Sequence, residues 1–233
     1  NVKTGRYPFG IALSPDQKKV YVANVGMFEY SYIKSLDKDR LNETALKFTA
    51  SAYGSREMIE GVKNDTLEFV GLGEMNELET FSVWAVDVSK EIPEVVSKVK
   101  TGVLVGEEEE GISAVGGSSP NSMVATDKFV YVSNGNNDNV SVIDITSDTV
   151  VSEIALKLDD RLGNLRGIIP FGLATSPDQK RLYVAEAGIN AVAVIDIETQ
   201  KVLGHIPTGW FPSKLKVTPD GKQLIVSNAK GYG

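Results

Sequence analysis

The sequence predicts an all-β fold: a partial β-propeller of about three and a half four-stranded blades, with a long insertion in the first blade. Residues 170–209 form the clearest unit, four short segments of alternating apolar residues separated by turn residues. A Ser-Pro-Asp motif recurs ahead of strands of the Tyr-Val type. The last two aspartates of these turns, Asp178 and Asp220, lie 42 residues apart, which matches the length of one propeller blade.

The repeat predicts four strands in each blade, which we term a to d in chain order. Strand a precedes the Ser-Pro-Asp turn and strand b follows it. The predicted b strands are Val20–Asn24, Val130–Asn134, Leu182–Glu186 and Leu224–Asn228. The predicted c strands are Val83–Val88, Val140–Ile145 and Val192–Ile197. The predicted d strands are Val95–Val99, Val150–Ile154 and Val202–Ile206.

Extra length is confined to two kinds of connection. The first b–c connection carries 53 residues more than its later copies, within the segment 27–80. Two d–a connections are longer than the last one by 16 and 10 residues. In an up-and-down blade both kinds of connection emerge on one face, so we expect that face to carry the function.

The insertion has no clear alternation of apolar and polar residues. We expect a partly ordered flap with a short helix around Asp37–Leu46, and a mobile loop without function is the alternative. Its aromatic residues suggest that it packs on something: Phe28, Tyr30, Tyr32, Phe48, Tyr53 and Phe69.

The ends of the chain also carry an expectation. It begins with Asn1 and stops after a b strand, at Gly233. We therefore expect residues 1–233 to be a single incomplete propeller domain. The remaining blades, or another chain, would be needed to close the ring, because an open arc exposes strand edges.

Composition narrows the function classes. The net charge of −7 argues against a nucleic-acid surface, which needs a basic face. With no cysteine, neither disulfides nor thiolate chemistry can operate. No run reaches the roughly 20 apolar residues of a membrane span.

The strand motifs resemble those of the YVTN-type β-propellers. They read YVAN at Tyr21–Asn24 and YVSN at Tyr131–Asn134. A narrower resemblance, carried by VANVGMFEYS (22–31) and GHIPTGWFPSK (204–214), is to bacterial proteins in which such a propeller precedes an alkaline-phosphatase-like phosphoesterase domain. This resemblance implies a periplasmic or cell-surface setting. Related propellers include lactonases.

Two polar segments could hold a cation. The acidic run Glu107–Glu110 has the carboxylates that Ca²⁺ prefers, but consecutive glutamates do not converge without a scaffold, so a solvated loop is favoured. The segment Asn134–Asn139 is better explained by turn chemistry. No cofactor is predicted, and Ca²⁺ remains the alternative at the acidic loops.

Other polar residues favour structural roles. His205, the only histidine, lies in a d strand, where a surface or satisfied side chain is favoured over a catalytic one. Aspartate recurs in strand c and proline at the start of strand a. Repetition indicates a structural role for both, with the aspartates accepting hydrogen bonds from a neighbouring turn. The residues are Asp87, Asp144 and Asp196, and Pro8, Pro120, Pro170 and Pro212.

The candidate ligand-binding residues lie on the insertion-bearing face. Arg6 and Arg166 are the predicted anion-binding pair, since guanidinium groups grip carboxylate or phosphate. Glu186 replaces the asparagine of the other copies. Lining a wet central channel is the alternative for the whole set, which is Arg6, Tyr7, Asn24, Asn121, Asn134, Arg166, Glu186, Trp210 and Asn228.

The predicted function is a non-catalytic binding or scaffold module of a larger secreted or surface protein. It would bind a small-molecule or protein ligand on the insertion-bearing face, with no nucleic acid and no membrane span. No catalytic residues are predicted in this chain. The alternative is the propeller portion of a phosphoesterase- or lactonase-type hydrolase whose catalytic part lies outside this chain. Cell-surface adhesion through the insertion is a third hypothesis.

Overall fold

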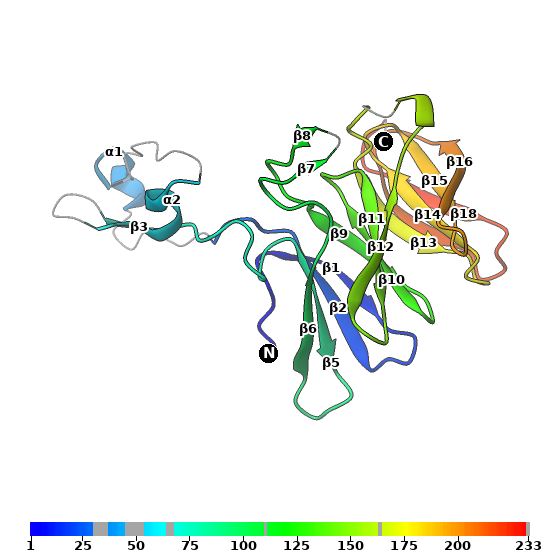
Figure 1. The fold of residues 1–233 in the computed structure, drawn as a ribbon, viewed down its shortest axis with the longest axis horizontal. Helices are drawn as coiled ribbons and strands as arrows, with labels where there is room; N and C mark the ends of the chain where they lie inside the picture. The colour runs from blue at the N-terminus through cyan, green and yellow to red at the C-terminus, as the bar shows by residue number, and fades with distance from the viewer. Residues whose placement is uncertain (30–36, 45–53, 64–67, 110, 163–164, 232–233) are drawn as a thin grey trace.

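The computed structural model describes residues 1–29, 37–44, 54–63, 68–109, 111–162 and 165–231. Three antiparallel sheets of four strands are followed by a pair of strands (Figure 1). The first blade holds β1 (Pro8–Leu13), β2 (Lys19–Asn24), β5 (Ser82–Asp87) and β6 (Glu94–Lys100). The second holds β9 (Pro120–Ala125), β10 (Phe129–Asn134), β11 (Asn139–Asp144) and β12 (Thr149–Ala155). The third holds β13 (Pro170–Thr175), β14 (Arg181–Glu186), β15 (Ala191–Asp196) and β16 (Lys201–Pro207), and the half blade holds β17 (Pro212–Val217) and β18 (Leu224–Asn228).

The blades form an arc with strand a innermost. β1 lies against β9, β9 against β13, and β13 against β17. Glycine permits the closest approaches, because a Cβ on Gly10 would lie 2.5 Å from the carbonyl oxygen of Asn121, and one on Gly172 would lie 2.5 Å from that of Ser213. The predicted partial propeller of three and a half blades is confirmed.

The Ser-Pro-Asp motif builds the turn between strands a and b. In the first blade the Asp16 carboxylate accepts hydrogen bonds from the Ser14 hydroxyl at 2.7 Å and the Lys18 N–H at 3.1 Å. The Ser14 oxygen in turn accepts the Lys19 N–H at 2.9 Å. These bonds, that from Ser14 first, hold the pKa of Asp16 below its ordinary value. The same bonds recur in the third blade and, with Thr218 in place of the serine, in the half blade.

The repeated aspartates and prolines have the predicted structural roles. Asp87, Asp144 and Asp196 each accept a hydrogen bond from a backbone N–H of the turn that follows strand c. Each of the four prolines is the first residue of a strand a, a position where the missing N–H costs no ladder bond. Both predictions are confirmed.

The core lies between the blades. Between the first and second blades the buried cluster consists mainly of small residues, such as Ala23, Ala85 and Val132. Between the second and third blades it contains larger side chains, among them Leu182 and Ile195. Each fully buried Val, Leu or Ile contributes roughly 1.5–3 kcal/mol, so these interfaces hold the arc together.

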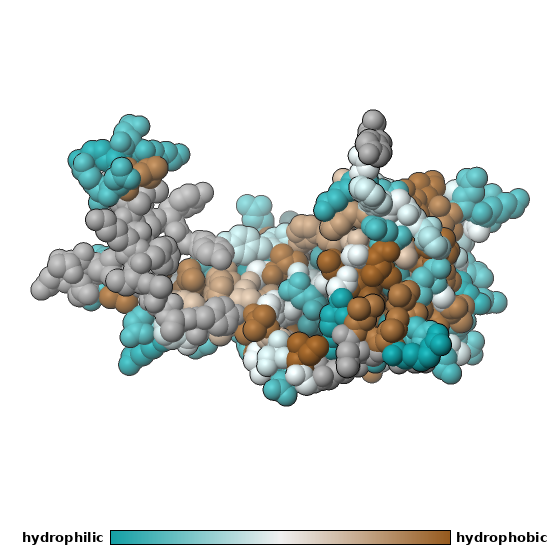
Figure 2. Space-filling view, turned by 90° about the horizontal axis from the view of Figure 1, so that it is seen from above, coloured by the Kyte–Doolittle hydropathy of each residue, from teal (hydrophilic) through white to brown (hydrophobic). Residues whose placement is uncertain are grey.

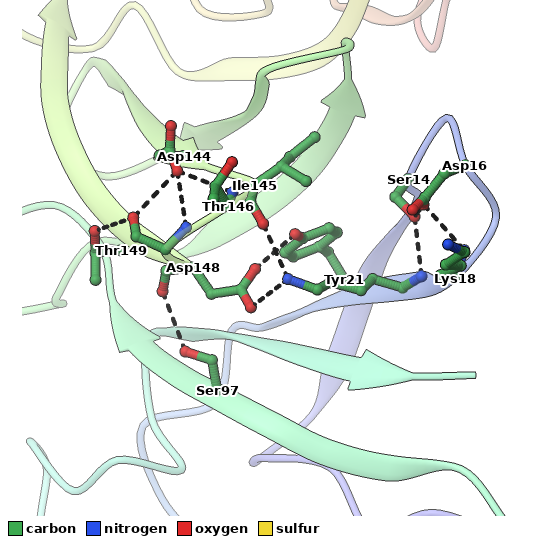
Figure 3. A network of polar contacts seen from close by, with 12 residues as sticks. Ser14, Asp16, Lys18, Tyr21, Ser97, Asp144, Ile145, Thr146, Asp148 and Thr149 are labelled. Atoms are coloured by element: carbon green, nitrogen blue, oxygen red, sulfur yellow. Dashed lines mark hydrogen bonds and ion pairs between the residues drawn. The ribbon is translucent and has the colours of Figure 1, made fainter. Parts of the chain in front are cut away.

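A polar clasp also joins the first two blades (Figure 3). The Lys19 ammonium contacts Asp148 Oδ2 at 2.6 Å and donates to the Ile145 carbonyl at 2.9 Å. The Tyr21 hydroxyl donates to Asp148 Oδ1 at 2.7 Å, and Ser97 donates to the Asp148 carbonyl at 3.1 Å. The clasp therefore links β2 and β6 to the turn between β11 and β12.

The insertion leaves the first blade between β2 and β5 and extends away from the sheets (Figure 1). It contains the 3-10 helix η1 (Lys38–Arg40), α1 (Leu41–Thr44), α2 (Arg56–Glu60), β3 (Gly61–Lys63) and β4 (Glu68–Val70). The helix expected around residues 37–46 is present from 38 to 44, and residues 45 and 46 lie outside the described residues. Of the six aromatic residues expected to pack, Tyr30, Tyr32, Phe48 and Tyr53 lie outside the described residues. Of Phe69 only the backbone is described. No helix in the described ranges is long and apolar enough to cross a membrane.

Candidate partner-binding face

All the long connections emerge on one face of the arc, at the top of the blades in Figure 1, which we term the loop face. The insertion follows β2 there. The β6–β9 connection contains the short strands β7 (Glu108–Glu109) and β8 (Ile112–Ser113), and the β12–β13 connection contains the 3-10 helix η2 (Asp160–Leu162). Among the described residues, the opposite face carries the short a–b and c–d turns.

The second blade's b–c loop organises the loop face. The Asp138 carboxylate, which is buried, accepts the Gly167 N–H at 2.7 Å and the Ile169 N–H at 2.9 Å. Asn137 Oδ1 accepts the Val103 N–H at 2.8 Å, and Asn136 donates to the Gly116 carbonyl at 3.1 Å. The segment 134–139 thus holds the two neighbouring d–a connections in place, which is the structural role that the sequence favoured over a cation site.

A pocket of about 410 Å³ lies between these connections. Its walls are Ile112–Gly117, the loop 135–138, and Arg166, Gly167 and Ile169. Around it, aliphatic side chains point to solvent: Val115 is 71% exposed and Leu165 54%. Viewed from above the loop face, apolar surface lies among polar surface over the blades (Figure 2). An exposed apolar patch of this kind typically marks an interaction site.

Arg6 anchors the insertion. Its side chain, only 8% exposed, donates to the carbonyls of Met27 and Glu74 at 2.9 and 2.7 Å and pairs with the Glu77 carboxylate at 2.8 Å. The two ends of the insertion are therefore tied together at one guanidinium. Lys100 reinforces the second end through Thr80, and burial is the first cause that lowers its pKa to about 8.

The two predicted anion-binding arginines line separate hollows. Arg6 and Tyr7 line a hollow of about 450 Å³ together with the acidic residues Glu29, Glu77 and Glu79. Arg166 lines the 410 Å³ pocket. Among the described residues, the structure does not bring Arg6 and Arg166 into one of these hollows.

Three other candidates lie inside the blades. Asn24, Asn134 and Glu186 are each the last residue of strand b and have no exposed surface. The Asn24 amide donates to Ser82, and the Asn134 amide donates to Asn139 and Ser141. A ligand on the loop face would not reach these side chains.

The remaining candidates divide by exposure. Asn121 is buried and bridges two blades, since its amide donates to the Pro170 carbonyl at 3.0 Å and its oxygen accepts from Ser133 at 2.9 Å. Tyr7 and Trp210 are 48% and 63% exposed on the loop face. Asn228 is exposed at the end of β18.

The acidic run forms no described metal site. Glu107 accepts the Leu104 N–H at 2.8 Å, and Glu108 and Glu109 form β7. Within the ranges that the structure describes, no three His, Asp or Glu side chains are grouped so that they could hold a metal ion. Glu110 lies outside those ranges, and the Ca²⁺ alternative stays untested.

Sequence reasoning missed the aliphatic residues of the loop face. Ile112, Val115 and Leu165 lie in connections without alternation, so no periodicity singled them out. Their signal was the presence of large apolar residues in segments that also carry Gly and Asn. The sequence assigned Asp138 only to the predicted turn Asn134–Asn139 and not to the candidate binding residues.

Comparisons with known proteins agree with the fold. The chain matches no family model. It is 30% identical to hydrazine synthase subunit beta of Kuenenia stuttgartiensis over an alignment of 117 residues, which covers 39% of this chain and 29% of that protein.

Solved structures cover nearly the whole chain. The Kuenenia stuttgartiensis hydrazine synthase superposes on 99% of it with a TM-score of 0.58 and 22% identity. Two proteins provisionally named 6-phosphogluconolactonases, from Bacteroides fragilis and Bacteroides uniformis, give TM-scores of 0.53 and 0.55 at 16% and 11% identity, over 95% and 97% of the chain. The chain spans about half of each of these structures, 45%, 47% and 51%. At these identities the likeness concerns the fold, and it agrees with an arc of propeller blades.

Proposed function

We propose that this chain is a protein-binding propeller module, and that the loop face around the 410 Å³ pocket is its binding surface. The observation that carries the proposal is the pair of long d–a connections. Asp138 and Asn137 accept hydrogen bonds from the backbones of these two connections and so hold them in place. The aliphatic side chains of the connections, such as Val115 and Leu165, are nevertheless exposed. Fixing the backbone reduces the entropy cost of binding, and exposed aliphatic residues supply apolar area.

The partner is a protein segment that offers apolar side chains. Val115 and Leu165 lie beside a pocket whose volume of about 410 Å³ is enough for one or two such side chains. The chain resembles a hydrazine synthase structure in fold and the beta subunit of hydrazine synthase in sequence. Both likenesses support a role within an assembly of several chains. Small-molecule binding is the weaker candidate, because the pocket is bordered by solvent-directed aliphatic residues.

A second candidate is the propeller portion of a hydrolase. The sequence resemblance to propellers joined to a phosphoesterase domain supports it, as do the structural matches to proteins provisionally named lactonases. The same resemblance supports a periplasmic or cell-surface setting as part of this proposal. If this chain alone hydrolyses lactones or phosphate esters, and loses that activity on substitution of Arg166, the hydrolase replaces the binding module as the function.

The binding proposal is tested by affinity capture from cells of the source organism with three versions of the full chain. Val115→Asp places a charge in the exposed apolar surface, and Ile92→Asp makes the same change on the opposite face, where Ile92 is 80% exposed. We expect one set of proteins to be captured by the wild type and Ile92→Asp, and recovery by Val115→Asp to fall at least fivefold. Equal recovery by all three would overturn the proposal.

A further inference from the structure

Glu186 occupies a position that is asparagine in the other blades, and its partner also differs. Asn24 and Asn134 donate to serines of strand c, Ser82 and Ser141. Glu186 instead contacts His205 of strand d, with 2.7 Å between Oε2 and Nδ1. Glu186 is fully buried, and its Oε1 has no hydrogen-bond partner among the described residues.

The second ring nitrogen of His205 fixes where the protons lie. Nε2 is 3.1 Å from the carbonyl oxygen of Lys157. A carbonyl only accepts, so Nε2 must carry a hydrogen. One further proton then lies between Nδ1 and Glu186 Oε2, as an imidazolium facing a carboxylate or as a neutral imidazole facing a carboxylic acid. Both forms keep both contacts.

Losing that proton breaks one of the two contacts. If Nε2 keeps its hydrogen, the lone pair of Nδ1 faces a carboxylate. If the hydrogen moves to Nδ1, the lone pair of Nε2 faces the Lys157 carbonyl. Each arrangement leaves one repulsive contact. Because a hydrogen bond to a carboxylate is stronger than one to a carbonyl, the single hydrogen lies on Nδ1 and the contact to Lys157 is the one that is lost.

The second blade makes the equivalent link without such a proton. Glu153 stands in register with His205, and Gly102 stands at the position of Lys157. Glu153 Oε1 accepts the Gly102 N–H at 2.9 Å and the Ser141 hydroxyl at 3.2 Å, and Oε2 accepts the Asn139 amide at 3.0 Å. A carboxylate that accepts from N–H and O–H groups needs no added proton. The third blade therefore reverses the direction of the link, from accepting to donating.

We propose that Glu186 and His205 form a proton-dependent clasp on the β12–β13 connection: with one proton between them they hold Lys157, and without it they release it. Lys157 is the second residue of the β12–β13 connection, which also carries Leu165 and Arg166 of the loop face. On the proposed function, which this inference extends, the clasp makes binding of the protein partner stronger at low pH than at high pH.

The charges around the pair favour the protonated form. Burial is the first cause that raises the pKa of Glu186, the negative charge of Asp138 raises it further, and His205 opposes both. Three more charged residues, Lys157, Asp159 and Lys201, line the same hollow of about 720 Å³ as the His205 imidazole. Because the folded-state pKa is raised, the contribution to stability is full below the ordinary pKa of a glutamate and is lost as the pH rises through the folded value.

The clasp is tested by NMR on the full chain, where His205 is the only histidine and gives a single set of ring signals. We would record the ring ¹⁵N shifts and the hydrogen exchange of amides 156–159 between pH 5 and 9. The ring signals should change once, and at the same pH the exchange rates, corrected for intrinsic pH dependence, should rise at least fivefold. A ring transition without a change in exchange would overturn the clasp.

Two variants sharpen the test. In Glu186→Gln the amide donates to Nδ1 and leaves the Nε2 hydrogen on Lys157 at every pH, so the pH dependence of exchange should disappear while protection is retained. The matched change Glu153→Gln should speed exchange at Gly102 and leave the pH dependence at residues 156–159 unchanged. A Glu186→Gln chain with the wild-type pH dependence would also overturn the clasp. These readouts need no partner, so loss of capture at every pH would contradict the proposed function alone.

Discussion

The interface between the first and second blades and the interface between the second and third use the same strands but different chemistry. In the first, Tyr21 reaches Asp148, which Lys19 also contacts. In the second, Phe129 stands at the position of Lys19 and Gln200 at that of Asp148. The equivalent Tyr131 is equally buried, but its hydroxyl has no hydrogen-bond partner among the described residues.

This difference shows that one blade geometry can be held by either of two means. The first interface has small apolar residues and a clasp of polar side chains. The second has a larger apolar cluster, which includes Leu182 and Ile195, and no described equivalent of the contacts that Lys19 and Tyr21 make with Asp148. A buried polar group costs free energy unless it is paired, so each interface should respond differently to the loss of a polar or an apolar group.

The largest effect should follow from Leu182→Ala in the apolar interface. Leu182 has no exposed surface, and the cavity left by truncation should lower the free energy of unfolding by about 4 kcal/mol. Urea unfolding measures it. The exposed Val151→Ala, on β12, is the control and should cost less than about 0.5 kcal/mol. Equal losses in both variants would show that this cluster is not the centre of the interface.

Asp148→Ala should be next, because it leaves the Lys19 ammonium and the Tyr21 hydroxyl without their shared acceptor. We expect a loss of about 3 kcal/mol. Gln200→Ala is the matched control, since both residues adopt the left-handed conformation, with φ of 51° and 55°. It should cost less than about 0.5 kcal/mol. A small loss for Asp148→Ala would mean that the clasp contributes little.

The two tyrosines give a closely matched pair. Tyr21→Phe removes a hydrogen bond to a carboxylate and should cost about 1.5 kcal/mol. Tyr131→Phe removes a hydroxyl that makes no described bond, so the free energy of unfolding should stay the same or rise slightly. If both changes cost the same in urea unfolding, the contrast between the interfaces fails.

The smallest expected effect is a loss of stability at alkaline pH, caused by ionisation of the two buried tyrosines. Burial raises the pKa of Tyr131 to about 12, and burial together with the bond to Asp148 raises that of Tyr21 further above its ordinary value. The raised pKa values make the folded state hold these protons, so stability is complete below about pH 10 and is lost as the pH rises towards the folded values. Absorbance at the phenolate band should show two tyrosines that ionise only on unfolding. Ionisation of all eight near the ordinary pKa in the folded protein would contradict this.

The strands and blades could be predicted because they leave a local signal. Alternation marks one buried face, and the Ser-Pro-Asp turn makes the same hydrogen bonds in each copy where it occurs. The contacts between blades leave no such signal. Lys19 and Asp148 lie far apart in the sequence, and alternation states which side of a strand is buried without saying what covers it.

The candidate site was predicted less well for the same reason. The count of connection lengths located the loop face, but it did not separate Arg6, which ties the insertion, from residues that border the pocket. Glu186 was recognised as a departure from the repeat. Its partner could have been sought at a second departure, where Leu156-Lys157 replaces the Thr-Gly that precedes the other blades, for example Thr101-Gly102.

The most direct test of the binding face is photo-cross-linking in cells of the source organism. A photoreactive phenylalanine analogue would replace Val115 or Leu165 on the loop face, or Ile92 on the opposite face. The account predicts the same cross-linked partner protein from positions 115 and 165 and none from position 92. Equal adducts from all three positions, or adducts from position 92 alone, would contradict it.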